Sequence, residues 1–180
     1  MVEQSSRIDE LVQSQIPDKV MTWFEDRSAM LIDPRNYKTG NFTAFYIIHH
    51  RSGDITYAAR QMKTYDTNGD TEDLVHLIDI DSNGNEEGQA EIRNNISNSN
   101  PYFKDKPFVG YTMTTEGLRN KGLGTRRLLI MNTFSKMLYG FPLHSDTLIS
   151  EGAKRLWERL VKEDKATKYL EGKNDRYRFT

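Results

Sequence analysis

The hydrophobic pattern of this 180-residue chain changes its period near residue 115, and that change constrains the fold more than any other feature. Before it, short runs rich in β-branched and aromatic residues are separated by turn signals, which is typical of strands. After it, apolar residues recur every three to four positions, which predicts helices. The expected strands of the first part are 42–49, 55–63, 74–80, 87–96 and 107–114. The second part is expected to hold helices over 125–139 and 151–163, a strand over 143–149 between them, and short strands near 166–170 and 176–179.

Turn signals and the N-terminal pattern complete the expected fold. Residues 51–54 and Asn83-Gly84 separate two pairs of strands, so two hairpins are expected. Within residues 1–36, apolar positions predict one helix around residues 8–16 and a second after Pro17. The prediction is a single domain over residues 1–180, of α+β (mixed α/β) class, with a central, mostly antiparallel sheet flanked by helices.

Composition excludes several classes of protein. The chain has no cysteine, which rules out a disulfide scaffold, a thiolate zinc site and a cysteine nucleophile. A formal net charge of −1 argues against a general nucleic-acid binder. No apolar run approaches the ~20 residues that span a bilayer, and the polar N-terminus does not resemble a secretory signal. A cytoplasmic protein that does not bind membranes is expected.

One segment carries a specific chemical signal, Arg119-Asn120-Lys121-Gly122-Leu123-Gly124-Thr125. It follows an expected strand and opens an expected helix. Glycines there let backbone N–H groups converge on one point, where the helix N-terminus adds roughly half a positive charge. Arg119 and Lys121 add full charges beside it. The segment predicts a pyrophosphate site, with a purely structural turn as the alternative. It is neither a Walker A loop nor the three-glycine dinucleotide motif.

The pattern Arg-x-x-Gly-x-Gly between a strand and a helix resembles the acyl-CoA-binding motif of the GNAT superfamily of N-acetyltransferases. Downstream, Ser150, Ala153 and Trp157 match the spacing at which the family often has Asn, Ala and Tyr. The order of elements over 107–180 agrees with that family, whereas the N-terminal third agrees only in outline. The same C-terminal pattern loosely resembles GNAT-like proteins of bacteriophages.

The resemblance implies a GNAT-like fold, with 107–180 as the acyl-CoA-binding half, and acetyl-CoA as co-substrate. It implies that the backbone at the end of the 107–114 strand pairs with the pantetheine arm. It also implies that amides of residues 121–125 hold the pyrophosphate and that Arg119 flanks it. The cofactor-binding residues expected on this basis are Met113, Thr114, Thr115, Arg119, Lys121, Gly122, Leu123, Gly124 and Thr125. An amine acceptor, a small molecule or a protein, would attack the thioester directly, so no covalent enzyme intermediate is required. The resemblance also implies a homodimer, because members of that family are often dimers.

The sequence departs from the family where the chemistry is done. Trp157 stands where a tyrosine often serves as the general acid, and an indole N–H only donates a hydrogen bond. Ser150 replaces the usual asparagine. Another acid serves, the thiolate leaves unaided, or the protein is not a catalyst. The simplest role for Trp157 is a place in an apolar helix stripe that faces the core.

Candidate bases are ambiguous. His144, Asp146 and Ser150 are the expected catalytic residues, and the spacing of the first two puts them on one face of a strand. A solvated His144–Asp146 pair is the alternative. His76, Asp79 and Asp81 lie on a middle strand, where an exposed face would also explain them. The run Asp79-x-Asp81-x-Asn83-Gly84 matches the start of a calcium loop, but Ala90 occupies the position that needs a bidentate Glu, so no metal site is expected.

The near-neutral total charge conceals a division along the chain. Residues 1–100 hold 9 basic and 17 acidic side chains, whereas residues 101–180 hold 16 basic and 9 acidic ones. The basic half contains the expected phosphate site, and the acidic half would favour a cationic acceptor.

The leading interpretation is an acetyl-CoA-dependent N-acetyltransferase. The alternative is a non-catalytic binding, inhibitor or structural protein, for example of a phage, with the same fold.

Overall fold

The computed structural model describes residues 7–30, 37–38, 41–65, 71–96, 106–118 and 121–180, and its α+β class agrees with the prediction. The elements in chain order are β1 (Ile8–Leu11), a one-turn 3-10 helix (Gln13–Gln15), α1 (Asp18–Met30), β2 (Tyr37–Lys38), β3 (Phe42–His49), β4 (Ile55–Tyr65), β5 (Thr71–Ile80), β6 (Glu86–Asn95), β7 (Phe108–Thr114), α2 (Leu123–Tyr139), α3 (Glu151–Lys162), β8 (Ala166–Glu171) and β9 (Asn174–Phe179).

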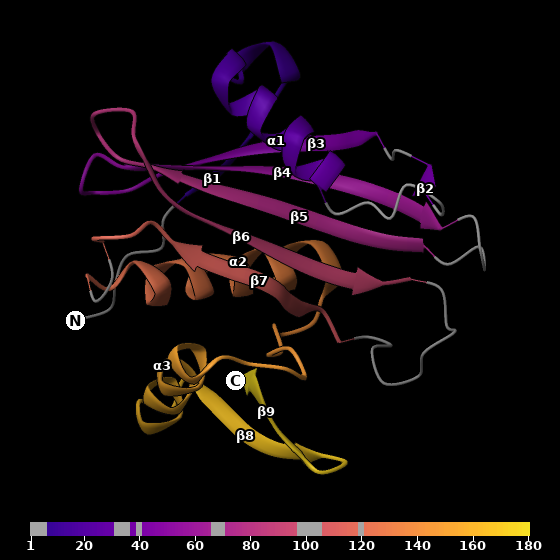
Figure 1. Ribbon diagram of the computed structural model, residues 1–180, viewed down its shortest axis with the longest axis vertical. Coiled ribbons are helices and arrows are strands. Elements are labelled where there is room, and N and C mark those ends of the chain that lie inside the picture. Colours follow the sequence, from indigo (N-terminus) through magenta and orange to yellow (C-terminus); the bar gives the residue numbers. More distant parts are fainter. Residues whose placement is uncertain (1–6, 31–36, 39–40, 66–70, 97–105, 119–120) are drawn as a thin grey trace.

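A large antiparallel sheet forms the centre of the molecule (Figure 1). Its strands lie in the order β1-β3-β4-β5-β6-β7, and the short β2 pairs with the far end of β4. Both predicted hairpins are confirmed. In the β5–β6 turn Gly84 has φ of +85°, and Asp81 Oδ1 accepts the backbone N–H groups of Asn83 and Asn85. The segment that resembles a calcium loop is therefore a hairpin turn.

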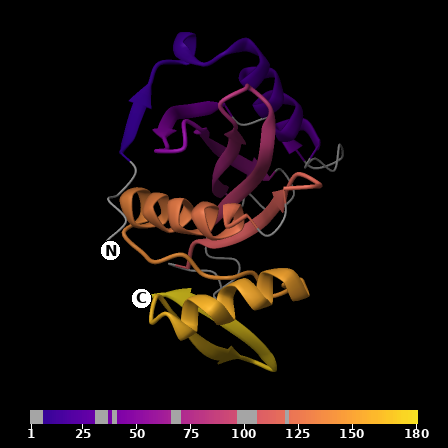
Figure 2. The same cartoon turned by 90° about the vertical axis from the view of Figure 1, so that its left-hand side faces the viewer.

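Helices α1 and α2 pack on opposite faces of this sheet (Figures 1 and 2). Val20 and Phe24 of α1 contact one set of strand residues, which includes Phe45. Phe134 of α2 belongs to the core on the other face, which includes Tyr46. Because consecutive strand residues face opposite sides, neighbours such as Phe45 and Tyr46 serve different cores. None of the helices in the described parts of the chain is long and apolar enough to cross a bilayer.

The C-terminal part forms a further layer next to α2, in which α3 packs on the β8–β9 hairpin (Figure 2). Trp157 of α3 is 2% exposed and stacks on Tyr177 of β9, with ring centroids 5.9 Å apart. Trp157 is thus a core residue, as its helical spacing indicated. His144 joins this layer to the main sheet, since it forms a parallel bridge with Phe108 and an antiparallel bridge with Arg178.

Two predicted elements are wrong. The pattern around residues 8–16 forms strand β1 and a single 3-10 turn instead of a helix, because residues 8–11 pair with β3 at the sheet edge. The strand expected over 143–149 is reduced to the bridge at His144. Asp146 Oδ1 instead accepts the N–H and the hydroxyl of the next residue, Thr147.

Candidate functional site

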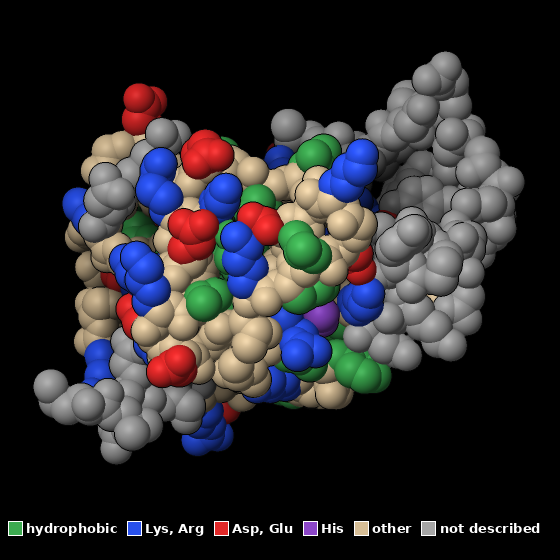
Figure 3. All heavy atoms as spheres, turned by 90° about the horizontal axis from the view of Figure 1, so that it is seen from below, with side chains coloured by type: hydrophobic (Ala, Val, Ile, Leu, Met, Phe, Trp, Pro, Cys, Tyr) green, Lys and Arg blue, Asp and Glu red, His purple; other side chains and the backbone are tan. Residues whose placement is uncertain are grey.

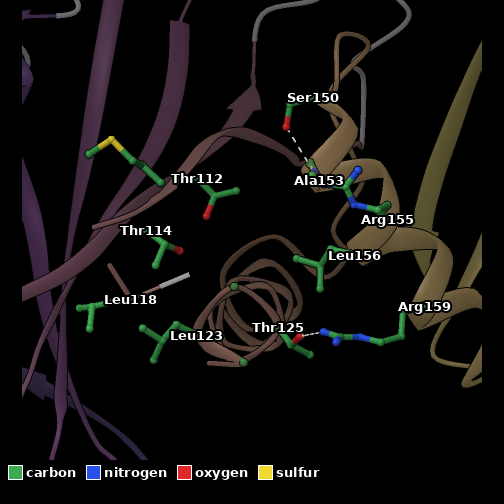
Figure 4. A pocket seen from close by; sticks show the side chains of 14 residues that line it. Thr112, Thr114, Leu118, Leu123, Thr125, Ser150, Ala153, Arg155, Leu156 and Arg159 are labelled. Atoms are coloured by element: carbon green, nitrogen blue, oxygen red, sulfur yellow. Dashed lines mark hydrogen bonds between the residues drawn. The ribbon is translucent and has the colours of Figure 1, made fainter. Parts of the chain in front are cut away.

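A cleft of about 700 Å³ opens between the end of β7, the start of α2 and one side of α3 (Figure 4). It lies between β7 and α2, the two elements on either side of residue 115, where the hydrophobic pattern changes its period. Its lining residues are Thr112, Met113, Thr114, Leu118, Gly122, Leu123, Gly124, Thr125, Ser150, Gly152, Ala153, Arg155, Leu156 and Arg159.

The N-terminus of α2 forms one wall of this cleft. Its N-cap is Gly122, which has φ of +81° and no side chain with which to cap the first-turn amides. The first turn of α2 holds no acidic residue. Leu123 is buried and anchors the turn, while Lys121 is exposed beside it. This wall therefore presents backbone N–H donors and the positive end of a helix dipole to an anion.

Helix α3 supplies cations to the opposite wall. Arg155 and Arg159 line the cleft with exposed side chains, and the guanidinium of Arg159 donates to the Thr125 hydroxyl on α2. The two helices approach closely, since a Cβ at Gly124 would lie 3.4 Å from Leu156 Cδ2. Figure 3 shows Lys and Arg side chains spread over the face of the molecule seen from below, with carboxylates between them. Within the cleft, Arg155 and Arg159 are the cations that a multiply phosphorylated ligand would meet.

The edge of β7 supplies polar backbone groups. Thr115 N–H donates to Glu87 O towards β6, so the backbone groups of Thr112 and Thr114 point away from β6 by alternation. Beyond Val109, no strand within the described parts of the chain pairs with this edge. The edge can therefore accept an extended ligand as if it were another strand. The Met113 carbonyl does not serve this edge, since it accepts from Arg127 Nη1 at 2.9 Å.

The structure does not bring the three expected catalytic residues together. Ser150 lines the cleft, but its Oγ accepts the Ala153 N–H and caps α3. Asp146 does not line the cleft, and its Oδ1 accepts the N–H of Thr147. His144 does not line the cleft, and its Nδ1 lies 2.8 Å from the Tyr169 hydroxyl. The strand that was the basis for a shared face of His144 and Asp146 is absent apart from the bridge at His144.

Burial and neighbouring cations determine the charge state of His144. Desolvation is the largest cause and, together with the charges of Arg176, Arg178 and Lys106, lowers its pKa to about 4. The imidazole is therefore neutral at pH 7. Its contacts join β7, β8 and β9, so its observed role is structural.

The expected cofactor residues cluster at the cleft. Those that line it are Met113, Thr114, Gly122, Leu123, Gly124 and Thr125. Thr115 and Lys121 adjoin them in the chain but are not lining residues. Arg119 lies outside the described residues.

Sequence reasoning missed several residues of this site. Thr112, Arg155 and Arg159 line the cleft. The signal in the sequence was the pair of arginines four residues apart on α3.

Behind Thr112 and Thr114, which form the floor of the cleft, Arg127 of α2 pairs with Asp79 of β5, with Nε donating to Oδ2 at 2.8 Å. The explanation that Asp79 lies on an exposed strand face is wrong, since this residue is fully buried.

The described residues contain no group of three or more His, Cys, Asp or Glu side chains able to hold a metal ion. No protein-family model, curated protein or solved structure matches this chain.

Proposed function

We propose that this protein is an acyltransferase that moves an acetyl group from acetyl-CoA to an amine. The observation that carries the proposal is the cleft at the start of α2, which combines uncapped N–H groups, two arginines and an open strand edge. Coenzyme A needs these three features, because it joins a pyrophosphate and a further phosphate to an extended arm with two amides. The resemblance of the glycine segment to the GNAT acyl-CoA motif supports the same ligand.

The reaction proposed is direct transfer. The amine nitrogen attacks the thioester carbonyl carbon, so a C–N bond forms and the C–S bond breaks. The amine loses a proton, and the sulfur leaves as the CoA thiolate, which takes up a proton. Among the described lining residues there is neither a carboxylate nor an imidazole. The proton therefore leaves through water, and the protein contributes chiefly by holding the two reactants in position.

Isothermal calorimetry with acetyl-CoA tests the cofactor. We expect binding by the wild-type protein and its loss in Gly124→Asp, which puts a carboxylate where the phosphates would lie. Gly124→Ala separates shape from charge and should bind. Thr133→Asp, at an exposed position further along α2, controls for added negative charge. No binding at millimolar acetyl-CoA, or normal binding by Gly124→Asp, would refute this assignment of the cleft.

A second candidate is a protein that binds acyl-CoA without turning it over. Two observations favour it: the buried Trp157 stands where the GNAT family, which the sequence resembles, often has an acidic tyrosine, and the described cleft lining holds no base. Release of free CoA thiol from acetyl-CoA, measured with a panel of amines, separates the candidates. Turnover of ~1 per second or faster is expected of an enzyme. Binding with no thiol release above the uncatalysed rate supports the second candidate.

A further inference from the structure

The hydroxyls of Thr112 and Thr114 lie on one face of β7 and line the cleft (Figure 4). Each Oγ1 lies 3.3 Å from Arg127 Nη1, which shares its two hydrogens among these hydroxyls and the Met113 carbonyl at 2.9 Å. A hydroxyl that accepts a hydrogen bond keeps its own hydrogen for donation. No acceptor for either hydrogen occurs among the residues that the structure describes. Both hydroxyls are therefore prepared to donate into the cleft.

Arg127 is held in place by a chain of buried hydrogen-bonding groups. Its Nε donates to Asp79 Oδ2, and the other carboxylate oxygen, Oδ1, accepts from the Thr56 hydroxyl at 2.5 Å. Its guanidinium reaches from Asp79 of β5 to the Met113 carbonyl of β7 and lies over Gly88 of β6, where a Cβ would lie 2.2 Å from Nη2. A hydrogen-bonded chain thus runs from β4 through β5 and α2 to the floor of the cleft.

Stability alone does not explain this chain. Arg127 is 1% exposed and Asp79 is fully buried, so both charges have lost their hydration. Replacement of a buried ion pair by apolar residues of similar volume is often neutral or stabilising. What the pair does provide is a fixed cation directly behind two hydroxyls. A hydroxyl that accepts from a cation is polarised and becomes a stronger donor.

We propose that Thr112 and Thr114 donate hydrogen bonds to the carbonyl oxygens of the pantetheine arm, and that Arg127 and Asp79 are positioning residues that prepare them. The inference rests on the proposed function, and it adds side-chain recognition of the arm to the backbone edge of β7. The arm has amide carbonyls spaced along an extended chain, and residues two apart on a strand offer donors on one face at a matching extended spacing. The phosphate-binding end of the cleft, at α2, is a separate set of groups.

Two ligands separate the arm from the phosphates. Coenzyme A carries both, whereas adenosine 3′,5′-bisphosphate lacks the arm. We expect Thr112→Val and Thr114→Val each to weaken binding of coenzyme A by about fivefold, because each removes one hydrogen bond at nearly constant volume. Their affinity for adenosine 3′,5′-bisphosphate should not change. Thr112→Ser and Thr114→Ser keep the hydroxyl and should bind coenzyme A like the wild type. Thr133→Val, exposed on α2, is the matched control.

Each outcome of these titrations decides between the two claims. Unchanged affinity of both valine variants for coenzyme A would overturn the inference, while loss of binding in Gly124→Asp would leave the cofactor assignment intact. An equal loss for both ligands would also overturn it, because the hydroxyls would then not be specific for the arm. If the wild-type protein binds neither ligand, the proposed function and the inference fail together.

Discussion

Gly88 lies directly beneath the guanidinium of Arg127, so that a Cβ on residue 88 would come within 2.2 Å of Nη2 and 2.3 Å of Met113 O. The space that this glycine leaves is occupied by a buried cation that runs from α2 to β7. Neither the guanidinium nor the backbone of β7 can move away without breaking a hydrogen bond, because Arg127 also binds Asp79 and the Met113 carbonyl.

The first prediction concerns this contact. Gly88→Ala should lower the free energy of unfolding by about 1 to 3 kcal/mol, as expected for overpacking in a dense interior. Gly124→Ala is the matched control, because its Cβ would meet only Leu156 Cδ2, at 3.4 Å, and alanine favours a helix. Urea denaturation of the three proteins measures the difference. Equal stability of the two alanine variants would contradict the proposed packing of Arg127.

Much of this arrangement could be predicted because local signals agreed with the final fold. The hairpin at Asn83-Gly84 and the helix after Gly122 each have turn residues and a hydrophobic period that indicate the same element. The segment around residues 8–16 misled because three apolar residues fit a helical face as well as a short edge strand. Pairing with β3, which lies more than 30 residues away in the chain, decides between the two, and no local pattern reports it.

The buried polar chain was harder to predict than the cleft. Asp79 was recognised as a candidate carboxylate, but its partner lies 48 residues further along the chain. Two signals were present. Arg127 interrupts an apolar helix stripe that includes Leu123 and Ile130, and Gly88 interrupts a strand, which often marks a close approach of another group. Each signal alone has a common structural explanation, and only the three-dimensional structure joins them.

A second prediction concerns Trp157, whose ring stacks on Tyr177 at an interplanar angle of 16°. Trp157→Ala should lower the free energy of unfolding by about 3 to 5 kcal/mol, since it leaves a large cavity in the C-terminal core. Trp157→Phe should cost less and should leave coenzyme A binding unchanged, because the indole lies in the core away from the lining of the cleft. A Phe variant of native stability that had lost acyl transfer would show instead that the indole takes part in the reaction.

A third prediction concerns pH. The pKa of His144 is about 4 in the folded protein, against about 6.5 for an unperturbed histidine. Between these values the unfolded chain binds the proton more readily, so stability falls as the pH drops from about 6.5 to 4, and His144 has no such effect above that range. We expect a loss of about 1 to 2 kcal/mol, a value reduced for partial solvent screening.

His144→Asn isolates this effect, because asparagine can still bond the Tyr169 hydroxyl but does not titrate. The variant should have a flatter dependence of unfolding free energy on pH between 5 and 6.5. His50, whose pKa burial also lowers, titrates in both proteins and cancels in the comparison. Parallel curves for the two proteins would show that His144 has the same pKa in the folded and unfolded states.

The last prediction concerns the cationic wall of the cleft. Arg155→Gln and Arg159→Gln should each weaken coenzyme A binding by roughly tenfold, the usual effect of losing a hydrogen bond to a charged group. Lys162→Gln removes an exposed cation from the last turn of α3, outside the lining, and is the control. Each arginine variant should also show a shallower dependence of affinity on salt concentration, because fewer charges attract the phosphates. An equal loss of affinity in all three variants would mean that the general positive charge of residues 101–180 attracts the ligand. A loss confined to the variants at positions 155 and 159 would indicate direct contact within the cleft.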